Sequence, residues 1–201
     1  MTGLWIVGAG GVGREALDVA LAAGVEVAGF LDDAPGLGTV RGLPVRGVAD
    51  APAGAEYVVA IAAPGPRERL SAALDAAGLR AVSLIHPRAV VAPETTWGAG
   101  FLAMANCHVS SSVTIGAHCQ VHYNATVGHD AVLEDFVSLY PGANVSGAVH
   151  LGRGATVGSG AVVLQGRTVG EGAFVGAGAV VTRDVAEGAV VVGSPARPLE
   201  R

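Results

Sequence analysis

The chain has 201 residues and a formal net charge of −5, with 51% hydrophobic and 14% charged residues. It carries no basic run, which argues against a nucleic-acid or anionic-membrane surface. No stretch reaches 18 consecutive apolar residues, and the first residues lack the basic segment and apolar core of a signal peptide. We therefore expect a cytoplasmic protein, and the length allows two small domains.

The first part of the chain has the pattern of a nucleotide-binding fold. Residues 8–13 read GAGGVG, in which Gly8, Gly10 and Gly13 satisfy GxGxxG. The surrounding pattern predicts a strand at Leu4–Val7, a helix at Arg14–Ala23, a strand at Val27–Leu31 and then two acids, Asp32 and Asp33. The N–H groups of such a turn and helix N-terminus favour a diphosphate, and the acids are placed for a ribose hydroxyl.

Three further elements complete this domain: a strand at Tyr57–Ala62, a helix at Arg67–Ala77 and a strand at Ala81–Leu84. The resulting parallel sheet is too small for the two mononucleotide halves of a dehydrogenase domain, so NAD chemistry is disfavoured. In the alternative interpretation, the glycines only pack the helix against the strand and bind no ligand.

The second half of the chain repeats every six residues. From Val91 to Val181 every sixth residue is Val, Leu, Ile, Ala or Trp, which gives sixteen consecutive hexads. The residue four places later is usually small or compact, with Phe101 and Arg167 as the main departures. This period predicts a parallel β-helix in which three hexads form one triangular coil. Sixteen hexads give about five coils and, at roughly 4.8 Å per strand, a prism about 25 Å long.

The two cysteines, Cys107 and Cys119, fall on inward positions of their hexads. Their separation of twelve residues puts them on different faces of the prism. We expect both to pack in the core as thiols and not to form a disulfide or a metal site. The six histidines have no ligand spacing, so no structural metal is predicted.

Several segments resemble the bacterial hexapeptide-repeat sugar acetyltransferases of the sialic-acid O-acetyltransferase and UDP-4-amino-sugar N-acetyltransferase type. They are residues 6–13 (IVGAGGVG), 30–33 (FLDD), 59–69 (VAIAAPGPRER), 84–87 (LIHP), the hexads and 191–197 (VVGSPAR). The resemblance implies a Rossmann-like α/β domain over residues 1–85 that holds a nucleotide-sugar acceptor. It also implies an all-β domain over residues 86–201, a left-handed parallel β-helix that binds acetyl-CoA, and a homotrimer with acetyl-CoA between subunits.

By the same resemblance, His129 is the catalytic base and Asp130 orients it. Acyl transfer from a thioester needs a base with a pKa near neutral, and a neighbouring carboxylate fixes the imidazole tautomer. His122 and Asn124, one hexad earlier, are candidates to line the acceptor cleft. From spacing alone, the alternative is that His129 is a solvated corner residue.

The resemblance also assigns the binding residues. The acceptor would contact Gly8, Gly10, Gly11, Gly13 and either Asp32 or Asp33. Acetyl-CoA would contact Ser138, at a position where some relatives carry a second histidine, and Gly147. Further along the prism Gly176, Ala177 and Gly178 allow close backbone approach to CoA, and Arg183 and Arg197 are candidates to pair with its phosphates. The alternative is that these two arginines are surface charges. Ala63 and Pro64 stand where relatives often carry a polar pair, so the sequence does not identify the acceptor.

We therefore predict an enzyme that transfers acetyl from acetyl-CoA directly to an amino group of a nucleotide-linked sugar. One alternative is O-acetylation of sialic acid or of another sugar hydroxyl. An alternative of another class is a non-catalytic β-helix used for binding or assembly. No acyl-enzyme is expected, because neither cysteine occupies an outward position beside a base.

Overall fold

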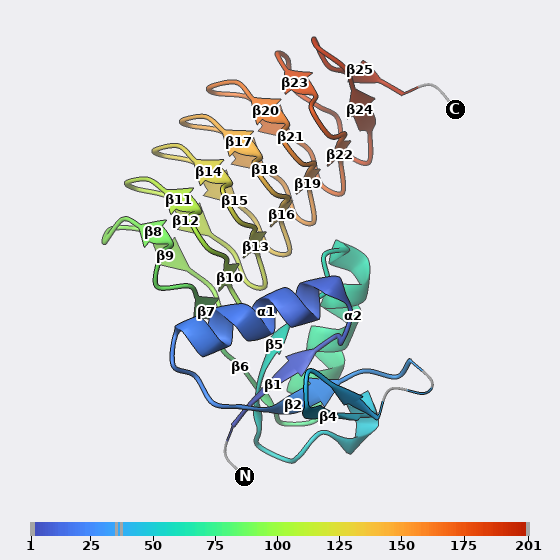
Figure 1. The fold of residues 1–201 in the computed structure, drawn as a ribbon. Helices are drawn as coiled ribbons and strands as arrows, with labels where there is room; N and C mark the ends of the chain where they lie inside the picture. Colours follow the sequence, from blue (N-terminus) through green and yellow to red (C-terminus); the bar gives the residue numbers. More distant parts are fainter. Residues whose placement is uncertain (1–2, 35, 37, 200–201) are drawn as a thin grey trace.

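The computed structural model describes residues 3–34, 36 and 38–199, which form an α/β domain followed by a parallel β-helix, as predicted (Figure 1). The sheet of the α/β domain has the strand order β3-β4-β2-β1-β5-β6. The six strands are β1 (Leu4–Val7), β2 (Val27–Leu31), β3 (Thr39–Val40), β4 (Leu43–Arg46), β5 (Glu56–Val59) and β6 (Arg80–Ala81). Neighbouring strands are parallel except in the β3–β4 hairpin.

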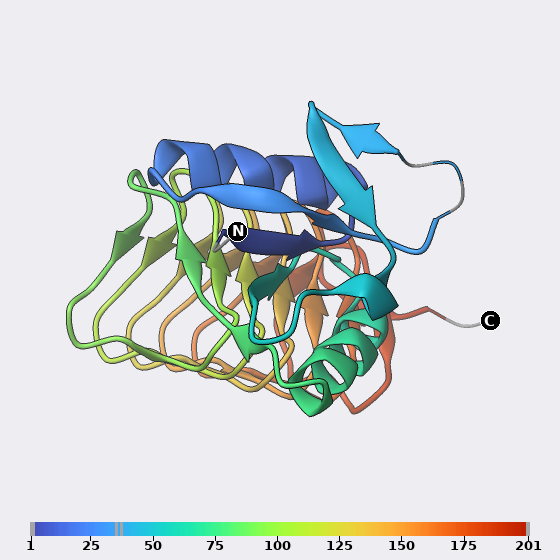
Figure 2. The same ribbon diagram turned by 90° about the horizontal axis from the view of Figure 1, so that it is seen from below.

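Two α-helices lie on opposite sides of this sheet (Figures 1 and 2). Helix α1 (Gly11–Ala22) lies between the sheet and the β-helix, and its buried side chains share one core with Leu84 and Leu102 of the β-helix. Helix α2 (Pro64–Ala76) covers the other side, and a short 3-10 helix, η1 (Val48–Asp50), follows β4. None of the helices in the described ranges is long and apolar enough to cross a membrane.

Strands β1 and β2 are confirmed at the predicted residues, whereas other boundaries differ. Both helices begin three residues earlier than predicted; α2 starts at Pro64 because the first helical turn tolerates proline. The strand predicted at Tyr57–Ala62 is β5, and it ends at Val59. The strand predicted at Ala81–Leu84 is two elements, because β6 ends at Ala81 and Leu84 already belongs to the β-helix.

The β3–β4 hairpin was not predicted from the sequence. Its two-residue turn, Arg41-Gly42, has positive φ at both positions, 50° and 81°. These angles belong to the type I′ turn, which usually carries Asn-Gly or Asp-Gly. An arginine in this conformation gives no such signal, since residues with a Cβ other than Asn and Asp rarely adopt it.

The β-helix is a triangular prism with three faces of short parallel strands. Face 1 contains β7 (Leu84–Ile85), β10 (Leu102–Ala103), β13 (Gln120–Val121), β16 (Ser138–Leu139), β19 (Thr156–Val157), β22 (Phe174–Val175), β24 (Val190–Val192) and the antiparallel β25 (Arg197–Pro198). Face 2 contains β8 (Val90–Val91), β11 (His108–Val109), β14 (Thr126–Val127), β17 (Asn144–Val145), β20 (Val162–Val163) and β23 (Val180–Val181). Face 3 contains β9 (Thr96–Trp97), β12 (Thr114–Ile115), β15 (Val132–Leu133), β18 (His150–Leu151) and β21 (Thr168–Val169).

The hexad pattern is confirmed, because each strand from β8 to β23 ends on one of the predicted residues. These residues are buried from Ala103 onward, whereas Trp97, near the N-terminal end of the prism, is 43% exposed. Cys107 and Cys119 are free thiols in the core, and burial raises the pKa of each to about 12.

Face 1 is the face that the α/β domain covers. Leu102, Gln120 and Ser138, whose side chains point outward from this face, are fully buried. Gln120 Nε2 donates to the carbonyl oxygen of Val59 at the end of β5, 2.8 Å away. His122 Nε2 lies 3.3 Å from Gln120 Oε1, and burial together with the charge of Arg67 lowers the pKa of His122 to about 4.

Gly11 and Gly13, in the first turn of α1, give a matched pair of substitutions. A Cβ at Gly13 would lie 1.9 Å from the carbonyl oxygen of Gly8, so we predict that Gly13→Ala lowers the free energy of unfolding by about 1–3 kcal/mol or more. A Cβ at Gly11 meets no atom within 4 Å, so Gly11→Ala serves as the control with unchanged or higher stability. Urea unfolding measures both, and equal midpoints for the two variants would contradict the packing role of Gly13.

The buried His122 predicts acid sensitivity. An unfolded histidine titrates near 6.5, so between this value and about 4 the unfolded chain binds a proton that folded His122 does not. Stability should therefore fall as the pH is lowered through this window, by about 3 kcal/mol at full effect. His122→Gln should remove this part of the slope in urea unfolding at a series of pH values. His108→Gln, which removes an exposed histidine on β11, should keep the parental slope.

Candidate active site

His129 and Asp130 form a hydrogen-bonded pair at an edge of the prism. They follow β14 after Gly128, on edge 2–3, defined as the series of turns that lead from face 2 to face 3. His129 Nδ1 lies 2.7 Å from Asp130 Oδ2, and the two side chains are 57% and 61% exposed. Since Nδ1 faces a carboxylate, it carries the proton of the neutral ring, and Nε2 is left as the basic nitrogen.

Gly147 makes room for the imidazole ring of His129. It lies one coil further along edge 2–3, and a Cβ there would be 2.6 Å from His129 Nε2 and 2.7 Å from Cε1. The backbones are also linked, because the N–H of Ala148 donates to the carbonyl oxygen of His129 at 2.7 Å. Glycine at position 147 therefore lets the ring rest directly on the next coil.

The register of the coils places a cationic residue on the same edge. Strands β14, β17, β20 and β23 pair in parallel at intervals of eighteen residues, so His129, Gly147, Gln165 and Arg183 stack along edge 2–3. Arg183 is three coils from His129, roughly 14 Å at the usual strand spacing. Arg183 and Arg197 line one cavity of about 260 Å³ at the C-terminal end of the prism.

Gly176, Ala177 and Gly178 lie on a different edge from His129. They follow β22 on edge 1–2, the turns that lead from face 1 to face 2. A Cβ at Gly176 would be 2.8 Å from Val192 Cγ1, so this glycine makes room for β24. Ala177 and Gly178 are exposed. Within one chain these three residues are therefore not part of the group formed by His129, Gly147 and Arg183.

Ser138 does not have the role expected from the sequence. Its strand, β16, lies on face 1 beneath the α/β domain, and its side chain is fully buried. Ser138 Oγ accepts a hydrogen bond from Arg67 Nη2 at 2.8 Å and donates one to the carbonyl oxygen of Ala62 at 2.9 Å. The hydroxyl is thus engaged at the domain contact and cannot donate to a thioester oxygen on edge 2–3.

The glycine turn, defined as residues 8–11 at the junction of β1 and α1, lies at the carboxyl ends of β1 and β2. Gly8 has a φ of 99°, and its N–H donates to the carbonyl oxygen of Leu31 at 2.8 Å. The space beside Gly10 and Gly11 is open, because a Cβ on either would meet no atom within 4 Å. A cavity of about 200 Å³ lined by Gly8 and Ile61 opens here, at the edge where parallel α/β sheets bind ligands.

Asp32 and Asp33 both line this cavity but also brace the backbone. Each oxygen of Asp32 accepts one backbone N–H, from Ala9 at 2.7 Å and from Ala34 at 2.8 Å. Asp33 Oδ1 accepts the N–H of Val48 at 2.8 Å. Asp32 therefore holds the glycine turn in shape as well as facing the space expected for the acceptor.

His122 and Asn124 lie on edge 1–2, away from His129. His122 is 3% exposed, and its ring centroid is 5.6 Å from that of Tyr140. Asn124 is exposed and has a φ of 59°. Within one chain both residues are therefore on a different edge from the candidate base, and His122 lies beside Gln120, which donates to Val59 of the α/β domain.

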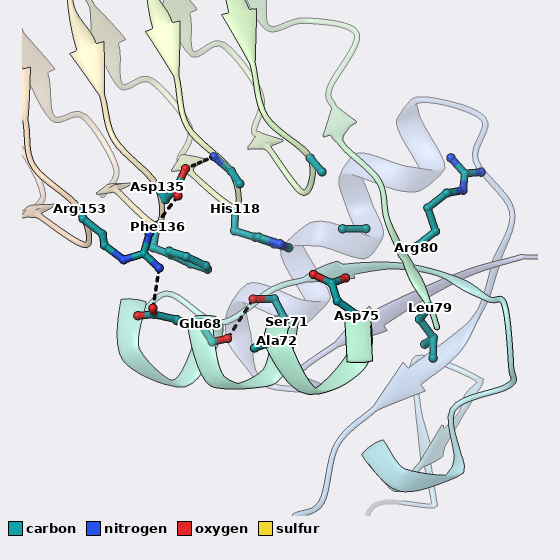
Figure 3. A pocket seen from close by; sticks show the side chains of 13 residues that line it. Glu68, Ser71, Ala72, Asp75, Leu79, Arg80, His118, Asp135, Phe136 and Arg153 are labelled. Carbon is teal, nitrogen blue, oxygen red and sulfur yellow. Dashed lines mark hydrogen bonds and ion pairs between the residues drawn. The ribbon is translucent and has the colours of Figure 1, made fainter. Parts of the chain in front are cut away.

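A further cavity of about 590 Å³, which the sequence did not indicate, lies between α2 and the edge that leads from face 3 to face 1 (Figure 3). On its wall Arg153 bridges Glu68 at 2.6 Å and Asp135 at 2.9 Å. His118 also lines it, and burial lowers the pKa of this histidine. No group of three or more potential metal ligands occurs among the residues placed by the structure.

Comparison with known proteins gives matches over both domains. Residues 3–74 match the family described as the PglD N-terminal domain. A GDP-perosamine N-acetyltransferase from Escherichia coli O157:H7 is 33% identical over 93 residues, which are 46% of this chain and 42% of that enzyme. The match thus spans less than half the length of this curated relative.

Solved structures match over almost the whole chain. The acetyltransferase domain of PglB from Neisseria gonorrhoeae FA1090, in complex with acetyl coenzyme A, is 35% identical over 98% of both chains, with a TM-score of 0.92. A variant of perosamine N-acetyltransferase from Caulobacter crescentus, in which one histidine is replaced by asparagine, was solved in complex with CoA and GDP-perosamine. It is 31% identical over 100% of this chain and 98% of that one, with a TM-score of 0.94. Identity at this level over nearly the full length of both chains shows that the protein belongs to the hexapeptide-repeat sugar acetyltransferase family.

Proposed function

We propose that the protein transfers the acetyl group of acetyl-CoA to an amino group of a nucleotide-linked sugar. The observation that carries this proposal is the His129–Asp130 pair on an exposed edge, with the ring of His129 resting on Gly147. The relatives support the choice of substrates, since one was solved with acetyl coenzyme A and another with CoA and GDP-perosamine. Because acetyl-CoA and nucleotide sugars are cytoplasmic metabolites, we place the reaction in the cytoplasm.

The proposed reaction is a direct transfer. His129 Nε2 removes a proton from the amino group while the sugar nitrogen attacks the carbonyl carbon of the thioester. The C–N bond forms, the tetrahedral intermediate expels the CoA thiolate as the C–S bond breaks, and the imidazolium returns the proton to sulfur. Asp130 stabilises the imidazolium, and the N–H of Gly147 is our candidate for stabilising the oxyanion. Both cysteines are buried with raised pKa values, which argues against an acyl-enzyme.

We propose that acetyl-CoA lies along edge 2–3, with its acetyl end at His129. Arg183 and Arg197 line one cavity three coils away, where their guanidinium groups can bind phosphates of CoA. Gly147 lies between these ends and presents backbone without a side chain to the ligand. Three of these residues, His129, Gly147 and Arg183, lie on edge 2–3, whereas Arg197 belongs to β25 on face 1 and lines the same cavity as Arg183.

The position of the α/β domain supports an assembly of several copies. This domain lies against face 1 (Figure 1). His129 follows β14 on edge 2–3, which is opposite face 1 in a triangular prism. An acceptor bound at Gly10 and Gly11 is therefore on the far side of the prism from the His129 of its own chain. We propose a homotrimer in which the acceptor domain and edge 1–2 of one copy, with His122, Asn124 and Gly176–Gly178, meet edge 2–3 of the next.

The role of His129 can be tested by the release of free CoA from acetyl-CoA with UDP-, dTDP- and GDP-linked amino sugars. We expect His129→Ala to lower kcat by about 10²- to 10⁴-fold, because a general base contributes this much. Asp130→Asn should cause a smaller loss, since an amide keeps a hydrogen bond but not the charge. His150→Ala is the matched control: His150 forms an exposed pair with Glu134 at 2.7 Å on face 3 and should keep parental activity. Parental kcat in His129→Ala would exclude it as the base, and no acetylation of any sugar by the parent would refute the proposed function.

The contact between the His129 ring and Gly147 gives a second test. Gly147→Ala should lower kcat by about tenfold or more, because its Cβ displaces the His129 ring from its position. The melting temperature should change little, since the displaced ring is exposed and can rotate. In the double variant His129→Ala, Gly147→Ala, the second change should add almost nothing to the first. Full additivity of the two losses would show that Gly147 acts independently of His129.

A further inference from the structure

We propose that Arg67 is a positioning residue that fixes the acceptor domain on the β-helix and thereby sets where the bound acceptor presents its amino group. Arg67 lies in the first turns of α2 and is fully buried between the two domains. The inference rests on the proposed function, to which it adds a residue that touches neither substrate.

The guanidinium of Arg67 binds both domains at once. Its close acceptors on the β-helix are two backbone carbonyls and one hydroxyl, with a third carbonyl, that of Val137, 3.5 Å from Nη2; its acceptors on the α/β domain are two carbonyls in the loop between β5 and α2. The hydrogen bonds are Nε to His118 O at 2.8 Å, Nη2 to Phe136 O at 2.5 Å and Ser138 Oγ at 2.8 Å, and Nη1 to Ile61 O at 2.7 Å and Ala62 O at 2.8 Å. All three nitrogens of the planar group are thus used, and their directions are fixed relative to one another.

All hydrogen-bond partners of Arg67 are uncharged, so burying its guanidinium between the domains is unfavourable compared with apolar packing. A guanidinium taken out of water loses hydration free energy, and here no carboxylate among the described residues lies within ion-pair distance to offset the loss. Apolar side chains could join the same surfaces at lower cost. The five N–H donors of the planar guanidinium, here called the fork, have fixed directions. They therefore define the relative orientation of the two domains more closely than apolar contacts would.

The contacts of Arg67 continue to the glycine turn. Arg67 holds the carbonyl oxygen of Ile61, and Ile61 Cγ1 is 2.8 Å from the position that a Cβ on Gly8 would occupy. Gly8 and Ile61 both line the cavity at the carboxyl ends of the parallel strands. A displacement of Arg67 therefore moves the phosphate-binding turn relative to the β-helix, and an error of about 1 Å in reactant placement can cost a hundredfold in rate.

Glu68, the next residue on α2, provides a matched control. Arg153 Nη2 pairs with Glu68 Oε1 at 2.6 Å and so joins the same helix to the same edge of the prism (Figure 3). This pair is exposed, with side-chain exposures of 36% and 47%, and water screens it. Removing it loosens one exposed contact between the domains without touching the buried fork.

The experiment compares Arg67→Lys and Glu68→Gln with the parent, as full-length proteins. Lysine keeps the charge but cannot reproduce the fork. We expect Arg67→Lys to lower kcat for the nucleotide amino sugar by about tenfold or more, with the Kd values of acetyl-CoA and of UDP, GDP and dTDP within about threefold of the parent. Glu68→Gln should match the parent in every constant. Parental kcat in folded Arg67→Lys, or an equal loss of kcat and acetyl-CoA binding, would overturn the proposal in favour of a purely structural role.

Ser138→Ala keeps the test decisive if Arg67→Lys does not fold. It removes one acceptor of the fork while leaving the remaining bonds, so a smaller loss of kcat with unchanged ligand Kd values is expected. Unchanged kcat in Ser138→Ala would count against the proposal. Where Arg67→Lys does fold, the two losses should be non-additive in the double variant, since they act on one hydrogen-bonded group, and full additivity would also count against the proposal.

Amide hydrogen exchange separates this inference from the proposed function, because it needs no turnover. In Arg67→Lys, peptides covering residues 59–66 and 116–120 should exchange about tenfold faster, with strands β20 to β23 unchanged. Unaltered exchange at the domain contact would overturn the role of Arg67 even in an active enzyme. Faster exchange in a protein that acetylates no sugar would leave Arg67 as the domain-orienting residue and refute only the proposed chemistry.

Discussion

The stacking of coils in parallel register is the constraint on which the rest of this structure depends. Each coil uses eighteen residues, and each of its short strands hydrogen-bonds to the strand eighteen residues later. Residues eighteen apart therefore lie directly above one another, whatever their chemistry. This rule places Gly147 against His129 and aligns Arg183 on the same edge, so the candidate site is a row along the prism and not a pocket within one coil.

The outward positions of the strands decide which face receives the α/β domain. On face 1 they include Leu84 and Leu102, which join the core beneath α1, and Gln120, which hydrogen-bonds to Val59. On face 3 the corresponding positions include Thr96 and Thr114, which are exposed. The domain therefore docks where apolar surface can be buried, and this choice leaves edge 2–3 exposed.

Much of this arrangement could be predicted from the sequence, because local patterns determine it. The six-residue period located every strand from β8 to β23, and the glycine pattern located β1 and β2. The eighteen-residue register also separates Gly176 from His129, since their spacing of 47 residues is not a multiple of eighteen. By the same reasoning Ser138, nine residues after His129, is half a coil away and falls on another face.

Contacts between distant segments could not be predicted in this way. Arg67 carries no local pattern that distinguishes it from the exposed Arg69 two residues later on the same helix. Its burial depends on carbonyl oxygens at His118 and Phe136, more than fifty residues further along the chain. Backbone carbonyls occur at every position, so a sequence cannot show which of them will meet a guanidinium.

The choice of uncharged partners for Arg67 also has an electrostatic consequence. A carboxylate partner would cancel the positive charge of the guanidinium, whereas carbonyl and hydroxyl oxygens leave it in place within a poorly screened interior. Burial is the main cause that lowers the pKa of His118 and of His122, and the charge of Arg67 acts in the same direction on both, so it favours the neutral rings. One buried side chain thus joins the two domains and holds a positive charge between them, which disfavours protonation of His118 and His122.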